Sequence, residues 1–199
     1  PAVMTYACET SGKVPSVVLD DERGGYEMTR YLISMGHRNI GVIGGRADNL
    51  HTGKRLLGYQ RALYENNICY NPDFVCYGNW KRTDGYELLP QLLRAGVTAV
   101  FCMADQMAGG VYDYLEEHGM KAGRDLSVAG FDNQEMAEYF RPALTTMELP
   151  LRQLGRTAAD LLLERLEGKE TEIREREIKI PCRLIRRCSV WEHMDSESR

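Results

Sequence analysis

Apolar, β-favouring runs alternate along the chain with segments whose apolar residues recur at helical spacing. The runs lie at 16–20, 40–45, 74–78, 98–105, 126–132, 144–149 and 176–185. Segments of helical period separate the first five runs, near 22–36, 54–67, 83–95 and 106–119. Strand and helix repeated in this order predict parallel sheets with helices on both faces, because each crossover between parallel strands carries a helix. The predicted fold class is α/β.

A further helix is expected after Pro150. Leucine and alanine recur at helical spacing over 151–166, and Gly168 is a plausible stop. The polar tail 191–199 is expected to be disordered. No internal repeat or flexible linker is visible, so if the chain forms two lobes it crosses between them through short segments.

Polar and aromatic side chains follow several of the predicted strands. In open parallel sheets, ligands bind beyond the carboxyl ends of the strands, so these residues are expected to meet at one rim. They are Arg55, Trp80, Asp105 and Asp132. Carboxylate and guanidinium groups bond to neighbouring hydroxyls, and an indole covers the apolar face of a sugar ring. The set therefore favours a polyol ligand.

Each rim residue also has a purely structural interpretation. Asp105 could cap the following helix, Trp80 could be a half-buried loop aromatic, and Arg55 could lie on a solvated helix face. Asp132 is harder to explain in this way, because no clear helix follows it. His51 could contact a ligand or face water, whereas His37 follows a predicted helix end and is expected to be structural.

Composition limits the class of protein. The 199 residues are 43% hydrophobic and 27% charged, which suits one large or two small globular domains. Lysine and arginine total 25 against 29 acidic residues, so this chain alone has no general positive field to bind DNA. No signal segment or membrane-length apolar run is present. A soluble, cytoplasmic protein without membrane contact is expected.

Enzymatic signatures are absent from the sequence. The six cysteines form no C-x-x-C pair and are interpreted as core thiols, with no metal site. No serine lies in a G-x-S-x-G elbow. The segment "HTGKR" has Asp48 and Arg55 where a phosphate loop needs Gly and Ser or Thr, and "GVIGGRAD" lacks dinucleotide-binding spacing. We expect a binding protein rather than an enzyme, with no cofactor.

Several ordered motifs resemble one family. They are "YLISMGHRNIGVIGG", "RLLGYQRAL", "AVFCMADQMAGGVYDYLEEHGM", "DLSVAGFDNQEMAEYFRPALTTMELP", "LGRTAADLLLERL" and "LIRRCSV". In this order, over about residues 1–190, they are similar to the effector-binding domain of LacI/GalR-type bacterial transcription regulators. The resemblance implies a two-lobed, periplasmic-binding-protein-like fold with the ligand in the cleft.

The resemblance also implies roles for individual residues. Arg55 matches the ligand-binding arginine of the family, Asp132 its cleft aspartate, and Trp80 the aromatic that stacks on the ligand. Asp105 matches the polar residue, Asn or Asp, of the family's D/N-x-M-A motif. Asn49 and His51 fall on a polar loop that members use less uniformly, and Tyr6 matches a position where some relatives have a polar contact from the other lobe.

The resemblance implies that the chain begins inside the amino-terminal lobe, so that lobe is expected to be incomplete. The DNA-binding helix-turn-helix and hinge of the family lie outside this sequence, and contact with operator DNA would need that head. The expected division begins with 1–39 for the rest of the amino-terminal lobe and 40–132 for the carboxy-terminal lobe. It continues with 133–175 for a crossover and a helix that returns to the amino-terminal lobe, 176–190 for the final strands of the carboxy-terminal lobe, and 191–199 for the disordered tail.

The expected function is that of a sensor that binds a sugar or sugar-like effector and modulates DNA binding, as a homodimer. A dimer interface could lie along helix 106–119 and near 66–78, although these residues could equally be internal core. Three alternatives stay open at this point. They are a solute-binding protein for sugar transport, a purine-sensing regulator, and a sugar-modifying enzyme, for which no catalytic base or metal site is visible.

Overall fold

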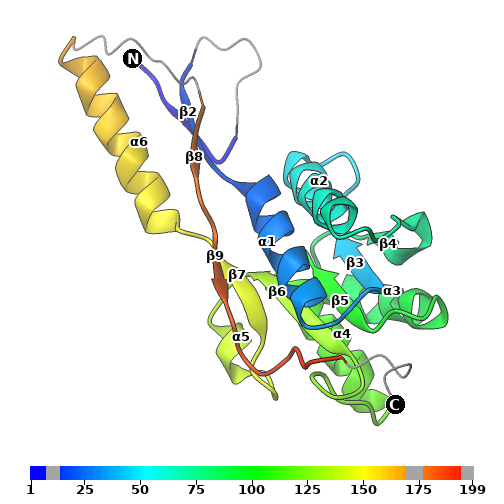
Figure 1. Ribbon diagram of the computed structural model, residues 1–199. Helices are drawn as coiled ribbons and strands as arrows, with labels where there is room; N and C mark the ends of the chain where they lie inside the picture. Colours follow the sequence, from blue (N-terminus) through cyan, green and yellow to red (C-terminus); the bar gives the residue numbers. More distant parts are fainter. Residues whose placement is uncertain (8–13, 169–176, 194–199) are drawn as a thin grey trace. The chain divides into compact units, whose positions relative to one another are not determined.

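The computed structural model describes residues 1–7, 14–168 and 177–193 (Figure 1). The strands are β1 Met4–Thr5, β2 Ser16–Leu19, β3 Ile40–Gly44, β4 Val75–Tyr77, β5 Ala99–Cys102, β6 Ser127–Asp132, β7 Thr145–Glu148, β8 Glu177–Ile180 and β9 Arg183–Ile185. The helices are α1 Asp21–Ser34, α2 Leu50–Glu65, α3 Arg82–Arg94, α4 Asp105–Glu117, α5 Met136–Tyr139 and α6 Leu151–Leu166, with a 3-10 turn η1 at Pro72–Phe74. The predicted α/β class is confirmed.

The chain divides into two compact units. The small unit comprises 1–20 and 149–183, and the large unit comprises 21–148 and 184–199. This division differs from the boundaries expected from the sequence, which placed 21–39 with the small unit and 176–183 with the large one. Helix α1 belongs to the large unit because it packs along α2, and β8 belongs to the small unit because it pairs with β2.

The large unit is built on a six-stranded sheet in the order β4-β3-β5-β6-β7-β9. Strand β3 lies between β4 and β5, and both pairings are parallel. Its residue Val42 is opposite Val75 of β4 and Phe101 of β5. Helices α1 and α2 pack together, as do α3 and α4 (Figure 1). The β3, β5 and β6 strands are buried on both faces, which explains why their sequences are continuous apolar runs.

Glycines bring the helices of each pair into backbone contact. A Cβ atom on Gly25 of α1 would lie 2.2 Å from the carbonyl oxygen of Arg55, and one on Gly58 of α2 would lie 2.0 Å from that of Glu22. The α3–α4 pair repeats the arrangement: Cβ atoms on Gly85 and Gly110 would lie 1.9 Å and 1.8 Å from the carbonyl oxygens of Met107 and Arg82. Any side chain at these four positions would push the helices apart.

The small unit contains the parallel sheet β1-β2-β8 and helix α6. Among its described residues, one buried hydrophobic cluster comprises Val17, Leu19, Leu154, Ala158 and Ile180. The predicted helix after Pro150 is confirmed, and it ends at Leu166, two residues before Gly168, which has φ +67°.

The expected strand at 176–185 is two strands in different sheets. β8 lies in the small unit and β9 in the sheet of the large unit, and Pro181, which has no N–H to donate, stands between them. After β9, the chain packs on the large unit, where the N–H of His193 donates to the carbonyl oxygen of Met35 at 2.7 Å. Residues 191–193 are therefore ordered, unlike the predicted tail, and 194–199 lie outside the described residues.

His37 has the structural role expected for it. It is fully buried, its Nδ1 lies 2.9 Å from the hydroxyl of Thr98, and its ring stacks on that of His193. Burial and the nearby His193 lower the pKa of His37 to about 4, so the ring is neutral at physiological pH.

Among the described residues, no helix combines the length and the apolar character that a membrane span needs.

Candidate functional site

Arg55 is at the centre of a buried polar cluster in the large unit. It lies on α2, and its side chain is only 3% exposed, so it is not a solvated surface arginine. Its Nε donates to Asp21 at 2.7 Å and its Nη1 donates to the carbonyl oxygen of Met103. The guanidinium carbon lies 3.7 Å from the centre of the Phe131 ring. These contacts hold the guanidinium group at the carboxyl ends of β5 and β6.

Asp21 is a member of the cluster that the sequence analysis did not single out. It begins α1, its second carboxylate oxygen lies 2.7 Å from Nδ1 of His51, and its side chain is 2% exposed. Burial raises the pKa of Asp21, but bonding to His51 and the charge of Arg55 outweigh burial and keep the pKa below its usual range. The signal was available, because Asp21 follows strand 16–19 just as the other rim residues follow theirs.

Trp80 lies beside this cluster. The loop before α3 places it with φ +66°, an uncommon backbone conformation for a large side chain. A Cβ atom on Gly45, directly after β3, would lie 1.9 Å from the Trp80 indole, so the indole occupies the space above that glycine. The Arg55 guanidinium carbon lies 5.7 Å from the Trp80 ring centre. The structure therefore brings two of the predicted site residues together.

Asp132 ends β6 and is partly exposed. Its φ is +115°, and its carboxylate lies 3.4 Å from the side-chain amide of Gln134. Burial raises the pKa of Asp132 to about 6, although the charge of Arg55 acts to lower it. A partly buried carboxylate with one long bond retains most of its capacity to accept hydrogen bonds.

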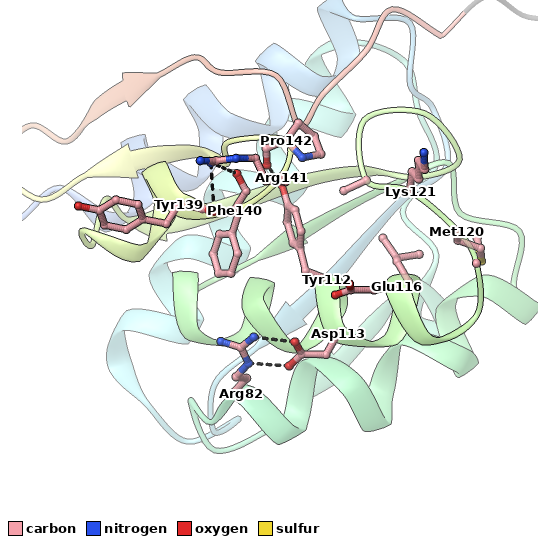
Figure 2. A pocket seen from close by; sticks show the side chains of 13 residues that line it. Arg82, Tyr112, Asp113, Glu116, Met120, Lys121, Tyr139, Phe140, Arg141 and Pro142 are labelled. Atoms are coloured by element: carbon pink, nitrogen blue, oxygen red, sulfur yellow. Dashed lines mark hydrogen bonds and ion pairs between the residues drawn. The ribbon is translucent and has the colours of Figure 1, made fainter.

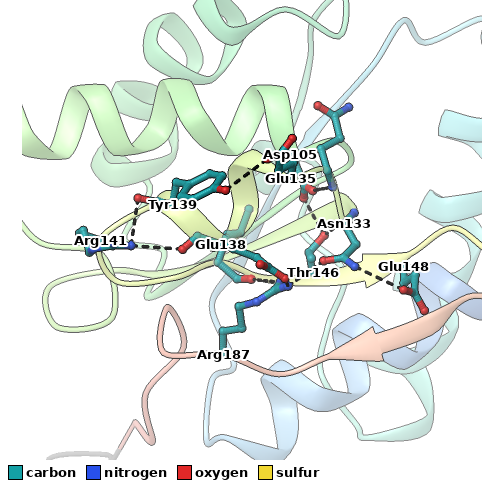
Figure 3. Close-up of polar contacts among 11 residues, drawn as sticks. Asp105, Asn133, Glu135, Glu138, Tyr139, Arg141, Thr146, Glu148 and Arg187 are labelled. Atoms are coloured by element: carbon teal, nitrogen blue, oxygen red, sulfur yellow. Dashed lines mark hydrogen bonds and ion pairs between the residues drawn. The ribbon is translucent and has the colours of Figure 1, made fainter.

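Asp105 is placed differently from Asp132. It is fully buried, with its Oδ1 accepting from the Thr146 hydroxyl at 2.6 Å and its Oδ2 accepting from the backbone N–H of Gln134 at 2.7 Å (Figure 3). The residue is the first of α4 rather than its cap, since Ala104 occupies the cap position. Burial raises the pKa of Asp105 to about 7. Its carboxylate bonds within the protein. It is therefore neither a surface cap nor an open ligand group.

Two other predicted residues have distinct placements. Asn49 is the N-cap of α2, because its side chain accepts from the backbone N–H groups of His51 and Thr52 at 2.9 Å and 3.2 Å. This cap explains Asn49 without a ligand, and α2 begins four residues earlier than the predicted start at 54. Tyr6 belongs to the small unit, has φ +66° and is 39% exposed. Its contribution to a site stays a prediction.

The cysteines only partly follow the core interpretation. Cys76 and Cys102 are buried in strands, whereas Cys69 and Cys188 are exposed. Across 1–7, 14–168 and 177–193, no group of three or more His, Cys, Asp and Glu side chains could hold a metal ion.

A separate groove lies on the large unit between α4 and the α5 segment (Figure 2). Its volume is about 710 Å³. Arg82 and Asp113 form a two-bond ion pair on its floor, with side chains 46% and 42% exposed. Tyr112 stacks on Phe140 within it and donates its hydroxyl to the Pro142 carbonyl oxygen. The groove is mixed in charge and partly aromatic.

Comparison with known proteins gives concordant matches. The periplasmic binding protein-like domain family matches residues 29–190. The HTH-type transcriptional repressor PurR of Vibrio campbellii is 38% identical over 174 residues, covering 86% of this chain and 52% of the repressor. The chain therefore spans about half the length of the curated relatives it matches.

Solved structures agree with this assignment. A LacI family transcriptional regulator from Enterococcus faecium with bound ribose is 31% identical with a TM-score of 0.83, covering 98% of this chain and 71% of that one. The transcriptional regulator CelR in complex with cellobiose is 30% identical with a TM-score of 0.84, covering 95% and 58%. These proteins are regulators rather than enzymes. The chain carries a periplasmic-binding-protein-like domain and belongs to the LacI family of transcriptional regulators.

Proposed function

We propose that the chain is the ligand-sensing domain of a transcription regulator and that the Arg55 cluster is its effector site. The effector is a carbohydrate or a sugar-like polyol. The observation that carries the proposal is the juxtaposition of a buried guanidinium, Arg55, with the indole of Trp80 and the under-bonded carboxylate of Asp132. The regulator from Enterococcus faecium has bound ribose and CelR is in complex with cellobiose, which supports this class of ligand.

The chemistry of the cluster suits a neutral ligand rich in hydroxyl groups. Asp21 already balances the positive charge of Arg55 at 2.7 Å, so an anionic effector would find no unneutralised arginine in this cluster. Asp132 can accept hydrogen bonds from hydroxyls, and Trp80 can cover the C–H face of a pyranose or furanose ring. His51, held by Asp21, lies one turn of α2 before Arg55, and its side chain is 18% exposed.

Calorimetric titration with D-ribose, cellobiose, other common sugars and the purine bases tests the ligand class. We expect at least one sugar to bind and Trp80→Ala to weaken that binding by roughly 1–3 kcal/mol through lost stacking. Binding of a purine base alone would replace the carbohydrate proposal with a purine effector. Chemical turnover of a bound sugar would contradict a pure binding role.

Regulation of DNA binding is the second part of the proposal. This chain covers about half the length of the curated relatives, which are named as HTH-type repressors, so a segment outside these 199 residues would contact operator DNA. Effector binding would then change operator affinity through a coupling free energy between the two sites. A DNA mobility-shift titration of the full-length protein, with and without the bound sugar, measures this coupling; no change in affinity would contradict it.

We further propose that the groove in Figure 2 is part of a homodimer interface. It presents both signs of charge, with Arg82, Lys121 and Arg141 near Asp113 and Glu116. A two-fold interface places one patch against itself, so a patch with both signs can be complementary to its own copy. Tyr139, 66% exposed at the groove edge, would become buried in such a dimer.

A further inference from the structure

We propose that Asp105 is a positioning residue for Asp132. Its buried carboxylate does not contact the effector but fixes the turn 132–134, and that turn directs the Asp132 carboxylate. The inference rests on the proposed function for its consequence in effector binding. Its structural content concerns only the turn at the end of β6.

The turn needs support because its backbone is unusual. Asp132 has φ +115° and Asn133 has φ +54°, two successive non-glycine residues with positive φ. Such conformations are unfavourable for residues with a Cβ atom and persist where surrounding contacts determine them. Asp132 and Asn133 occupy these positions. Glycine would adopt this backbone conformation more easily but would offer no side chain.

Asp105 contacts the last residue of the turn. Its carboxylate accepts the backbone N–H of Gln134 at 2.7 Å. The bond joins the first residue of α4 to the end of the turn, 29 positions away in the sequence.

The surroundings of Asp105 are adapted to this role. A Cβ atom on Gly130 would lie 2.3 Å from Oδ1 of Asp105, so the strand carries glycine where the carboxylate lies. The same oxygen accepts the Thr146 hydroxyl from β7 at 2.6 Å, which leaves Oδ2 aimed at Gln134. The Asp105 side chain is therefore held by bonds from β7 and from Gln134, and it packs against the glycine of β6.

A second contact holds the middle of the turn. Arg187 donates to the side-chain oxygen of Asn133 at 2.9 Å and to Glu138 at 3.0 Å (Figure 3). The Asn133 amide in turn lies 3.4 Å from a carboxylate oxygen of Glu148. With Asn133 fixed from this side, the Asp105–Gln134 bond is the contact that sets the direction in which Asp132 leaves the strand.

Two substitutions at position 105 separate positioning from general stability. Asp105→Asn keeps an oxygen for the Gln134 N–H, and its amide can donate to Thr146, whose hydroxyl can turn to accept. Asp105→Ala removes both bonds. We expect hydrogen exchange at the Gln134 amide to accelerate by about tenfold or more in Asp105→Ala, relative to the amide of Val42 in β3, and to return close to wild type in Asp105→Asn. Equal acceleration at both amides would overturn the proposal.

Effector affinity gives the second readout, with D-ribose and cellobiose as probes. Asp105→Ala should weaken binding of the sugar that binds by about tenfold in the wild-type background. In an Asp132→Asn background, the same change should weaken binding by no more than about twofold, because Asp105 acts through Asp132. The same loss in both backgrounds would overturn the proposal. If neither sugar binds the wild-type protein, the proposed carbohydrate function fails, while the exchange measurement still decides the role of Asp105.

Discussion

Arg55 and Asp21 form a buried ion pair, 2.7 Å between Nε and Oδ1, that joins two residues 34 positions apart in the sequence. The side chains are 3% and 2% exposed, so neither charge is solvated by bulk water. A pair of this kind is weak evidence for net stabilisation, but removing one partner leaves an uncompensated buried charge. The pair therefore links the candidate effector site to the folding of the large unit.

Replacing Arg55 should affect stability as well as binding. We expect Arg55→Ala to lower the free energy of unfolding by about 3–5 kcal/mol, because Asp21 would be left buried without its partner. Urea denaturation measures the change. Arg46→Ala is a control, because Arg46 pairs with Asp48 on the surface, with side chains 62% and 69% exposed, and should change stability little. Equal, small effects of the two substitutions would mean that water reaches Asp21.

The raised pKa values of Asp105 and Asp132 predict how stability changes with pH. The pKa is about 7 for Asp105 and about 6 for Asp132, against 3.8 for an ordinary aspartate, so the folded state binds protons more tightly than the unfolded state over this interval. The two aspartates should therefore lower the free energy of unfolding as pH rises from about 4 to about 7, whereas His37, whose pKa is lowered to about 4, should raise it between about 4 and 6.5. Asp21, whose pKa is lowered, acts in the opposite direction, and its contribution is lost only as pH falls below about 4.

Denaturant titrations at several pH values between about 4.5 and 7.5 measure this slope. In Asp105→Asn the part of the slope due to Asp105 should disappear, because the amide does not titrate in this range. Binding of a sugar should also strengthen as Asp132 ionises around pH 6, since the carboxylate accepts hydrogen bonds from hydroxyls. A wild-type stability that rises steadily through this interval would contradict both assignments.

Gly58 should not tolerate even alanine. A Cβ atom there would lie 2.0 Å from the carbonyl oxygen of Glu22, so Gly58→Ala must move α1 and α2 apart and should destabilise the protein by about 1–3 kcal/mol. Gly53 is a matched control on the same helix, since a Cβ atom there meets nothing within 4 Å. Gly53→Ala should be neutral or stabilise by up to about 1 kcal/mol. Thermal melting of both variants checks the pair, and a destabilising Gly53→Ala with a neutral Gly58→Ala would reverse the interpretation.

The proposed dimer depends on the groove in Figure 2. Tyr139→Arg places an extra charge at its edge and should raise the dissociation constant of the dimer in sedimentation equilibrium, without lowering the melting temperature of the monomer. Tyr64→Arg is the control, because Tyr64 is 83% exposed on α2, away from the groove. Tyr112 is unsuitable for this test, because it is only 9% exposed and its hydroxyl bonds to Pro142. A Tyr139→Arg protein that associates like wild type would place the interface elsewhere.

Hydrophobic periodicity predicted most of the elements because strands buried on both faces and one-sided helices leave clear patterns. It could not divide 176–185, since β8 and β9 are both apolar and differ only in which strand each one joins. The rim rule selected Arg55, Trp80, Asp105 and Asp132, but a single sequence has no signal for the bond between Asp105 and Gln134, 29 positions away. Asn49 was a ligand candidate only through the family resemblance; the structure shows it as the N-cap of α2, and its contact with a ligand stays a prediction.

The backbone contacts at Gly25 and Gly58 have a consequence for engineering. They fix the separation of α1 and α2, and therefore the placement of Asp21 and Arg55. The atoms in contact belong to the backbone, which every residue type shares. A library aimed at a new ligand can therefore randomise Trp80 and its neighbours in the loop before α3, because that loop takes no part in the helix contact. Variants that keep Gly25 and Gly58 should keep Arg55 in its present position. Selection would then act on the fit between the site and the ligand, rather than on restoring the fold.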